Sequence, residues 1–190
     1  MSAFTITNEN KKYRLSVRAQ IAATLCAIVG AVVLPWFVHL VGQVSGLGTL
    51  PGEVFLPMHL PIFLVGLLAG PYAGAIAGLL GPAVSFLLSG MPLVTNLPLM
   101  MIELCAYGLF AGLLNHARMS VLWKVLAVQL AGRAVRALAV LFAVYVCSDT
   151  AVSVASVYTG LRAGLLGMLL QLVLIPLICH RVEDMMDHES

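Results

Sequence analysis

The sequence predicts an all-α integral membrane protein, a compact bundle of six transmembrane helices with both termini in the cytoplasm. Its 190 residues are 61% hydrophobic and only 9% charged, whereas soluble domains carry roughly 25% charged residues. The mean hydropathy is +1.03, and several apolar runs approach the roughly 20 residues that a helix needs to cross a bilayer. These runs are continuous, as at 165–178, whereas a membrane β-barrel would alternate apolar and polar positions. We therefore predict one transmembrane domain over residues 1–190.

The first predicted helix covers residues 17–38, an apolar run that follows a polar, cytoplasmic N-terminal segment at 1–16. An extracellular loop that contains glycine and proline follows at 39–58. The second predicted helix, 59–69, is short and stops at a Gly-Pro pair, because glycine and proline commonly interrupt helices.

The third predicted helix, 72–88, ends where the sequence Ser-Gly-Met-Pro breaks the apolar run. Because this helix and the one before it are short and tightly joined, they could instead form one kinked or re-entrant hairpin. Two crossing helices are favoured, since an even number of spans preserves the distribution of basic residues described below. The last three predicted helices are 97–114, 121–146 and 158–179, and a cytoplasmic tail follows at 181–190.

The basic residues predict the orientation, because lysine and arginine collect in cytoplasmic loops. With six spans, the loops at 39–58, 89–96 and 147–157 share one side, contain no lysine or arginine, and hold Glu53 and Asp149. The opposite side is predicted to be cytoplasmic. It holds these basic residues: Lys11, Lys12, Arg14, Arg18, Arg118, Lys124 and Arg181.

A stripe of small residues lies on the first predicted helix. Alanine recurs at every fourth position, and residues four apart share a helix face. Small side chains let another helix approach closely in a membrane, and that helix could belong to the same chain or to a partner. The stripe consists of Ala19, Ala23, Ala27 and Ala31.

Four ionisable residues interrupt the apolar helices: Glu103, Arg133, Arg136 and Arg162. A charge exposed to lipid is costly, so these side chains should face the bundle interior or a wet cavity. Arg133 and Arg136 are three positions apart and share a helix face. One glutamate among three arginines leaves an excess of positive charge, which a carboxylate or phosphate ligand could neutralise. Alternatively, a Glu103–Arg136 pair could only join two helices, and the other arginines could snorkel.

Several uncharged polar residues accompany this set near the predicted extracellular side. His59, Asn96 and Tyr158 are candidate substrate-binding residues, although His59 at a helix entry could instead have an interfacial or capping role. Gln129 and Gln171 lie at mid-membrane positions, where we expect hydrogen bonds between helices.

The sequence contains no common catalytic or nucleotide-binding motif, so we expect no enzymatic activity and no cofactor. Its four cysteines are scattered and predict neither a disulfide framework nor a metal site. The net charge of +2 gives no reason to expect a nucleic-acid partner. A channel would need rings of similar residues along a pore, whereas a single polar cluster is typical of a binding pocket.

The segment HLPIFLVGLLAGPYAGAIAGLLGPAVSFLLSGMP at 59–92 and the stretch ELCAYGLFAGLL at 103–114 resemble the S components of energy-coupling factor (ECF) transporters. With the six predicted helices, the resemblance covers nearly the whole chain. It implies that the alanine stripe docks on coupling helices of a transmembrane T component. It also implies that the loop at 39–58, including Gly46 and Gly48, acts as a lid over the site.

The resemblance further implies a substrate-binding subunit of an ABC-type importer, energised by two ATPase subunits, in the plasma membrane of a prokaryotic cell. The substrate would be a water-soluble vitamin or vitamin precursor. The excess of arginine favours an anionic compound such as pantothenate, folate, niacin or lipoate, while a neutral precursor is possible if Glu103 cancels an arginine. The alternative is a structural or assembly protein whose buried charges serve helix packing.

Overall fold

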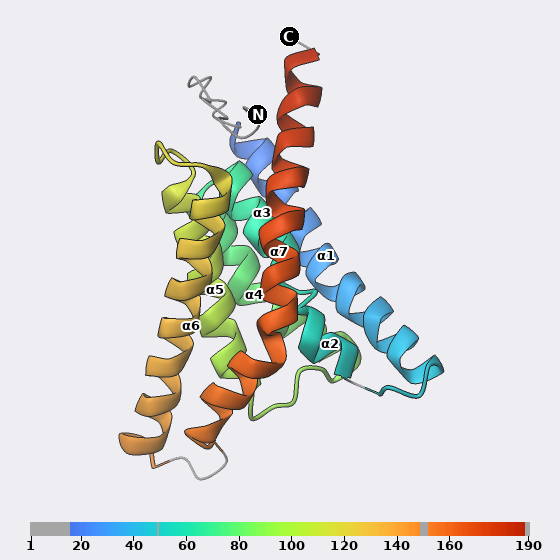
Figure 1. Cartoon of the computed structure of the whole chain (residues 1–190), viewed down its shortest axis with the longest axis vertical. Coiled ribbons are helices and arrows are strands. Elements are labelled where there is room, and N and C mark those ends of the chain that lie inside the picture. The colour runs from blue at the N-terminus through green and yellow to red at the C-terminus, as the bar shows by residue number, and fades with distance from the viewer. Residues whose placement is uncertain (1–15, 49, 149–151, 189–190) are drawn as a thin grey trace, which may run out of the picture.

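The computed structural model of the chain describes residues 16–48, 50–148 and 152–188. Within these ranges every regular element is a helix (Figure 1). Five of them, α1, α4, α5, α6 and α7, are long and apolar enough to cross a membrane, and α3 is a shorter apolar helix. The helices are α1 (Val17–Val44), α2 (Leu50–Phe55), α3 (His59–Ala69), α4 (Pro71–Ser89), α5 (Leu97–Leu114), α6 (Val121–Tyr145) and α7 (Ala155–His188).

Four helices match the predicted segments closely, and two of them, α3 and α5, have the predicted bounds. The predicted loop at 39–58 is partly helical instead, because α1 continues to Val44 and α2 forms inside it. The reason for the longer α1 is local: Gly46 is the first residue after 39 with a left-handed backbone (φ 74°). There the amides of Leu47 and Gly48 donate back to the carbonyl of Gly42, which closes the helix.

The C-terminal helix also extends beyond its predicted end at 179, because α7 continues to His188, within the predicted cytoplasmic tail. Its sequence there contains no glycine or proline, and His180 lies 3.7 Å from Asp184 one turn later. Residues 1–15, 49, 149–151 and 189–190 lie outside the described ranges. The predicted segment 1–16 and its basic residues therefore fall almost wholly outside them, as do Asp149 and the end of the tail.

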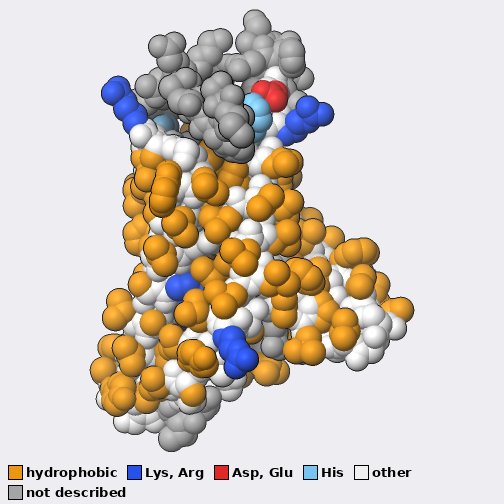
Figure 2. Space-filling view, viewed as in Figure 1, with side chains coloured by type: hydrophobic (Ala, Val, Ile, Leu, Met, Phe, Trp, Pro, Cys, Tyr) orange, Lys and Arg blue, Asp and Glu red, His pale blue; other side chains and the backbone are white. Residues whose placement is uncertain are grey.

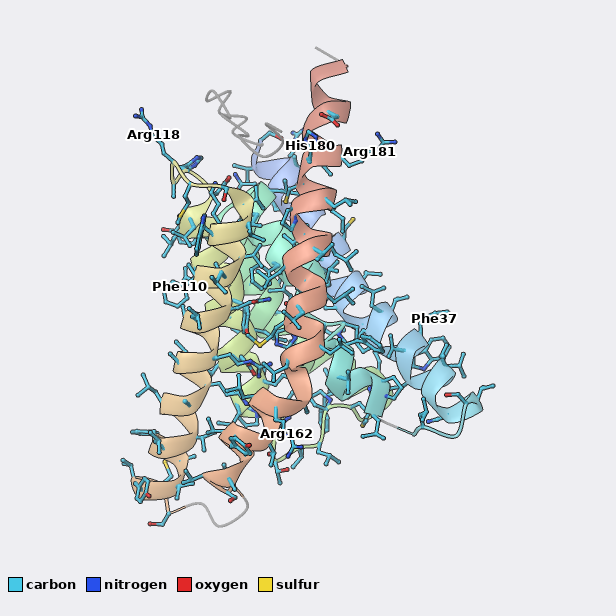
Figure 3. The ribbon with its side chains drawn as sticks, in the orientation of Figure 1. Phe37, Phe110, Arg118, Arg162, His180 and Arg181 are labelled. Atoms are coloured by element: carbon cyan, nitrogen blue, oxygen red, sulfur yellow. The ribbon has the colours of Figure 1, made fainter. Side chains whose placement is uncertain are left out.

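Apart from the short α2, the helices run alternately up and down, so that the start of α1 and the end of α7 lie at the same end of the bundle (Figure 1). Helix α1 diverges from the others toward its C-terminal end (Figure 1). Hydrophobic side chains cover the middle of the surface (Figure 2). Arg118 and Arg181 lie at the upper end and Arg162 lies in the lower half (Figure 3). The start of α1 thus shares an end with two of the residues that were predicted to be cytoplasmic.

Helices α4 and α5 pack with their backbones in contact. A methyl group added at Gly74 would meet the carbonyl oxygen of Gly108, and one added at Gly108 would meet that of Gly74. We call this the glycine contact. Only glycine permits so close an approach, which gains packing energy where lipid supplies no hydrophobic drive. The glycine contact fixes α5, the helix that carries Glu103, against α4.

Candidate functional site

The centre of the candidate site is Glu103 on α5, which is buried and only 1% exposed. Arg133 Nη1 lies 3.0 Å from Oε1 of Glu103, and Arg136 Nη1 donates to Oε2 at 2.8 Å. Both arginines are on α6, one turn apart, so a single helix face presents two guanidinium groups to one carboxylate. We call Glu103, Arg133 and Arg136 the charged cluster. The sequence predicted that these three residues face the interior, and the structure brings them together.

Asn96 belongs to the same arrangement. It precedes the first turn of α5, and its Oδ1 accepts a hydrogen bond of 2.9 Å from Arg136 Nη2. Two separate points of α5 therefore hold one guanidinium, through neighbouring nitrogens. Because the guanidinium group is planar and presents its donors in a fixed fork, these two contacts set its orientation.

His59, the first residue of α3, completes the site from the other side of Glu103. Its Nε2 lies 3.9 Å from Glu103 Oε1, beyond hydrogen-bond distance, and the residue is 2% exposed. The imidazole ring meets the ring of Tyr107 edge to face, with centroids 5.0 Å apart. Tyr107 in turn packs against Phe63 and donates a long hydrogen bond of 3.5 Å to the carbonyl of Gln129. Aromatic rings therefore form one wall beside the charged cluster.

The charged cluster contains two cations and one anion, and it has unused donors. Nε and Nη2 of Arg133 and Nε of Arg136 are buried donors without a hydrogen-bond partner among the described residues. Both ring nitrogens of neighbouring His59, one a donor and one an acceptor in the neutral ring, and the acceptor Glu103 Oε1 likewise have no hydrogen-bond partner there. Buried polar groups are almost always hydrogen-bonded, and each unsatisfied one costs about 1–3 kcal/mol. The arrangement can therefore accept a further anionic, hydrogen-bond-accepting group.

Two candidate residues on α7 are not part of this arrangement. Arg162 is exposed, and Tyr158 is 67% exposed. The α7 residue that approaches Arg133 is Gly164, where an added methyl group would lie 2.6 Å from Arg133 Nη2. Arg162 is two positions earlier, about 200° around the helix, and so it points away from the cluster. Figure 3 shows it in the lower half of α7.

The alanine stripe of α1 packs largely within the chain. Ala31 and Ala27 are 0% and 6% exposed and share a core cluster with Ile62 of α3 and Ala77 of α4, while Ala23 is partly buried against that cluster. The alanine spacing is compatible with packing against a helix of the same chain or of a partner, and the structure shows packing within the chain. Ala19 is partly exposed, and docking of a partner along the stripe stays a prediction.

The two predicted lid glycines, Gly46 and Gly48, have positive φ angles of 74° and 61°, and a methyl group added at either would meet open space. The lid assignment stays a prediction. The sequence did not predict the path of the chain after these glycines, where α2 and the residues after it turn inward against α7. A methyl group added at Gly167 would lie 2.6 Å from the carbonyl oxygen of Val54.

Two buried glutamines hydrogen-bond between helices, as predicted. Gln129 Nε2 on α6 donates to Gln171 Oε1 at 3.3 Å and to the carbonyl of Met168 at 3.0 Å, both on α7. The sequence did not single out Tyr107 or Gly164. Tyr107 could have been found from its place one turn after Glu103, on the same helix face. Gly164 carries no side chain, so only the approach of Arg133 reveals its importance.

Two cavities of about 300 and 280 Å³ lie between α1 and α4. The first is lined by Trp36 and Leu88, among others, and the second by Ile21 and Tyr72, among others. Neither is lined by the charged cluster. The side chains of the charged cluster are themselves little exposed, 2% for Glu103 and 13% for each arginine.

A family model described as the substrate-specific component of ECF transporters matches residues 31–179 of the chain. The matched segment includes the charged cluster, Asn96, His59 and Tyr107, and all of α2–α6. Comparison with curated proteins and with solved structures gives no match.

Proposed function

Because the chain belongs to the family of ECF transporter substrate-specific components, we propose that it binds an anionic, vitamin-like small molecule at the charged cluster. Membership of this family makes it a multi-pass membrane subunit of a transporter and implies a small-molecule substrate. It also implies T and ATPase components as partners. In particular, we propose that the chain binds a water-soluble vitamin or vitamin precursor with high affinity, as the substrate-binding subunit of an ABC-type importer that holds two ATPase subunits.

The observation that carries the proposal is the excess of cationic donors around Glu103. Two guanidinium groups face one carboxylate, and three of their buried nitrogens have no acceptor among the described residues. A ligand carboxylate could bind there through charge-assisted hydrogen bonds, which are about twice as strong as neutral ones. The rings of His59 and Tyr107 would supply an apolar wall for the rest of the ligand.

This chemistry selects a class of compound instead of one vitamin. Pantothenate, folate, niacin and lipoate each carry a carboxylate and fit the proposal. A neutral precursor would bind if the negative charge of Glu103 fully offset the positive charge of one arginine. The remaining hydrogen-bond donors would then recognise the precursor. Glu103 itself could accept a hydrogen bond from the ligand, because its Oε1 has no aligned donor among the described residues.

We further propose six membrane crossings, with α3 as the shortest, in the plasma membrane of a prokaryotic cell. Eleven residues of α3 rise only about 16 Å, so the segment from α2 onward would supply the rest of that crossing. The end that holds Arg118 and Arg181 (Figure 3) would face the cytoplasm. The charged cluster would then be reached from outside, past Gly46 and Gly48 as parts of the lid.

For the T component we propose contact along α1 at the partly exposed Ala19 and Ala23. A bulky leucine at either position should reduce uptake in cells and leave ligand binding by the purified subunit unchanged. Normal uptake by both variants would remove this part of the proposal.

Ligand binding is tested by thermal unfolding of the detergent-purified subunit, without ATP, in the presence of pantothenate, folate, nicotinate or lipoate. A compound present at 100 times its Kd should stabilise the folded state by about 2.7 kcal/mol. Arg133→Gln should abolish that shift. Arg162→Gln is the matched control, because it makes the same chemical change at an exposed position of α7.

The second candidate is a structural role for the charged cluster. Two observations favour it: both oxygens of Glu103 already have a cationic neighbour, and the two cavities lie elsewhere. If no compound shifts the melting temperature, and Arg133→Gln and Glu103→Gln only lower it, the structural role is the better account.

A further inference from the structure

One face of α7 meets both the candidate site and the chain segment that leads into α3. Gly164, Gly167 and Gln171 are spaced three and four positions apart, which places them on the same side of the helix. We call these three residues the α7 seat. Residues 54–56, which are the last two residues of α2 and the first residue of the connection to α3, pack against the seat. We call them the joining segment.

The two glycines of the seat are sites of close approach. A methyl group at Gly167 would lie 2.8 Å from the carbonyl carbon of Phe55, and one at Gly164 would lie 2.9 Å from Leu56 Cδ1 and 2.6 Å from Arg133 Nη2. Any larger residue would push the joining segment or the guanidinium away. Gly160, one turn before Gly164, has no such neighbour within 4 Å.

Gln171 adds a directed contact to this packing. Its Nε2 donates to the carbonyl of Leu56 at 3.4 Å, and the same carbonyl accepts the backbone N–H of His59 at 3.1 Å. Leu56 has a φ of 48°, a left-handed conformation that is unusual for a residue with a side chain. Gln171 is itself held by Gln129, and both glutamines are almost fully buried. One acceptor thus joins α7 to the first residue of α3.

We infer that Gln171 is a positioning residue for the substrate site: through the Leu56 carbonyl it fixes the start of α3 and so places the His59 ring beside Glu103. Gly164 and Gly167 allow this contact by letting the joining segment and Arg133 reach α7. This inference rests on the proposed function, because the site that Gln171 positions is the proposed substrate site.

The direct test is backbone amide hydrogen exchange of the full chain in detergent, with Gln171→Leu compared with the wild type. Loss of one hydrogen bond of about 1 kcal/mol should speed exchange at residues 54–59 about fivefold. Exchange within the glycine contact of α4 and α5 should not change. Unchanged exchange at 54–59 would overturn the inference, whether or not any ligand binds.

A second pair of variants keeps the test decisive if Gln171→Leu does not fold. Gly164→Ala should speed exchange at 54–59, and it should weaken binding of whichever compound among pantothenate, folate, nicotinate and lipoate stabilises the wild type. Gly160→Ala should do neither. Equal exchange in the two alanine variants would contradict the inference, whereas a wild type that binds none of the four compounds would count against the proposed function alone.

Discussion

The two faces of α5 are held by opposite kinds of interaction. Toward α4, it packs through glycine, with Gly108 against Gly74 and no side chain between the backbones. Toward α6, it presents Glu103 to two long arginine side chains. The first contact leaves almost no room for adjustment, whereas the second consists of flexible side chains with unused donors. The comparison indicates that one face of α5 serves as a rigid support, and the other is the adaptable side where we propose that a ligand binds.

The largest effect should come from removing the anion of the charged face. Glu103→Ala leaves two buried guanidinium groups without their partner, and breaking a buried pair in this way typically costs about 3–5 kcal/mol. We expect a fall of that size in the free energy of unfolding, measured by denaturation in detergent. Combining the change with Arg133→Ala and Arg136→Ala should restore part of the loss. A loss below about 1 kcal/mol would mean that the cluster is not buried as described.

A single added methyl group should destabilise the glycine contact between α4 and α5. Gly108→Ala places a Cβ against the carbonyl of Gly74, and such overpacking typically costs about 1–3 kcal/mol. Gly160→Ala, which meets open space within α7, is the control, and it should leave stability unchanged or raise it by up to about 1 kcal/mol, because alanine is the better helix former. Equal melting temperatures for the two variants would show that α4 and α5 can separate without cost.

Asn96→Ala should lower stability less than the two changes above, and it should affect ligand binding more than the change at the glycine contact does. Asn96→Ala removes one of the two groups that orient the Arg136 guanidinium, and a hydrogen bond to a charged group contributes about 1.5–3 kcal/mol. We expect Asn96→Ala to lower the free energy of unfolding by an amount at the low end of that range, because Asn96 is only partly buried. Ligand affinity, measured by titration calorimetry, should fall more than it does for Gly108→Ala at a temperature where both variants are folded. The reverse order would place the ligand away from Arg136.

The smallest effect is expected at Arg162. Because its side chain is exposed and lies on the far side of α7 from Gly164, Arg162→Gln should change stability by less than about 0.5 kcal/mol. Ligand-induced stabilisation should equal that of the wild type. A large loss of binding would mean that α7 rotates to bring Arg162 to the ligand, and would support the role that the sequence predicts for it.

The sequence allowed most of the helices to be predicted. The predicted end of α1 and the missing prediction of α2 were wrong for local reasons. The bounds of α5 follow from an apolar run between Asn96 and Asn115. The predicted end of α1 is too early because 39–44, which contains His39, Gly42 and Gln43, has the composition of a loop, although none of these residues stops a helix in the structure. Helix α2 begins with Leu-Pro-Gly, a sequence that is typical of turns.

The candidate site was predicted in composition, and the Glu103–Arg136 pair was one of the alternatives, but the rest of the arrangement was not predicted. Glu103, Arg133 and Arg136 were identifiable because charges inside apolar helices must turn away from lipid. Arg162 satisfied the same criterion, yet it is exposed. Near a helix end an arginine can reach the polar interface along its own stem, so its presence in an apolar segment does not by itself place it in the interior.

By itself, the sequence determined that this chain is a helical membrane protein and that its central charges must be shielded from lipid. Both conclusions depend on the free energy of transferring each residue into hydrocarbon, a property that hardly depends on the neighbouring helices. The tertiary structure alone decided which arginines meet Glu103, that Gly108 faces Gly74, and that the Leu56 carbonyl is shared by Gln171 and His59. These contacts depend on the rotation and spacing of several helices at once, which are set by the packing of the whole bundle.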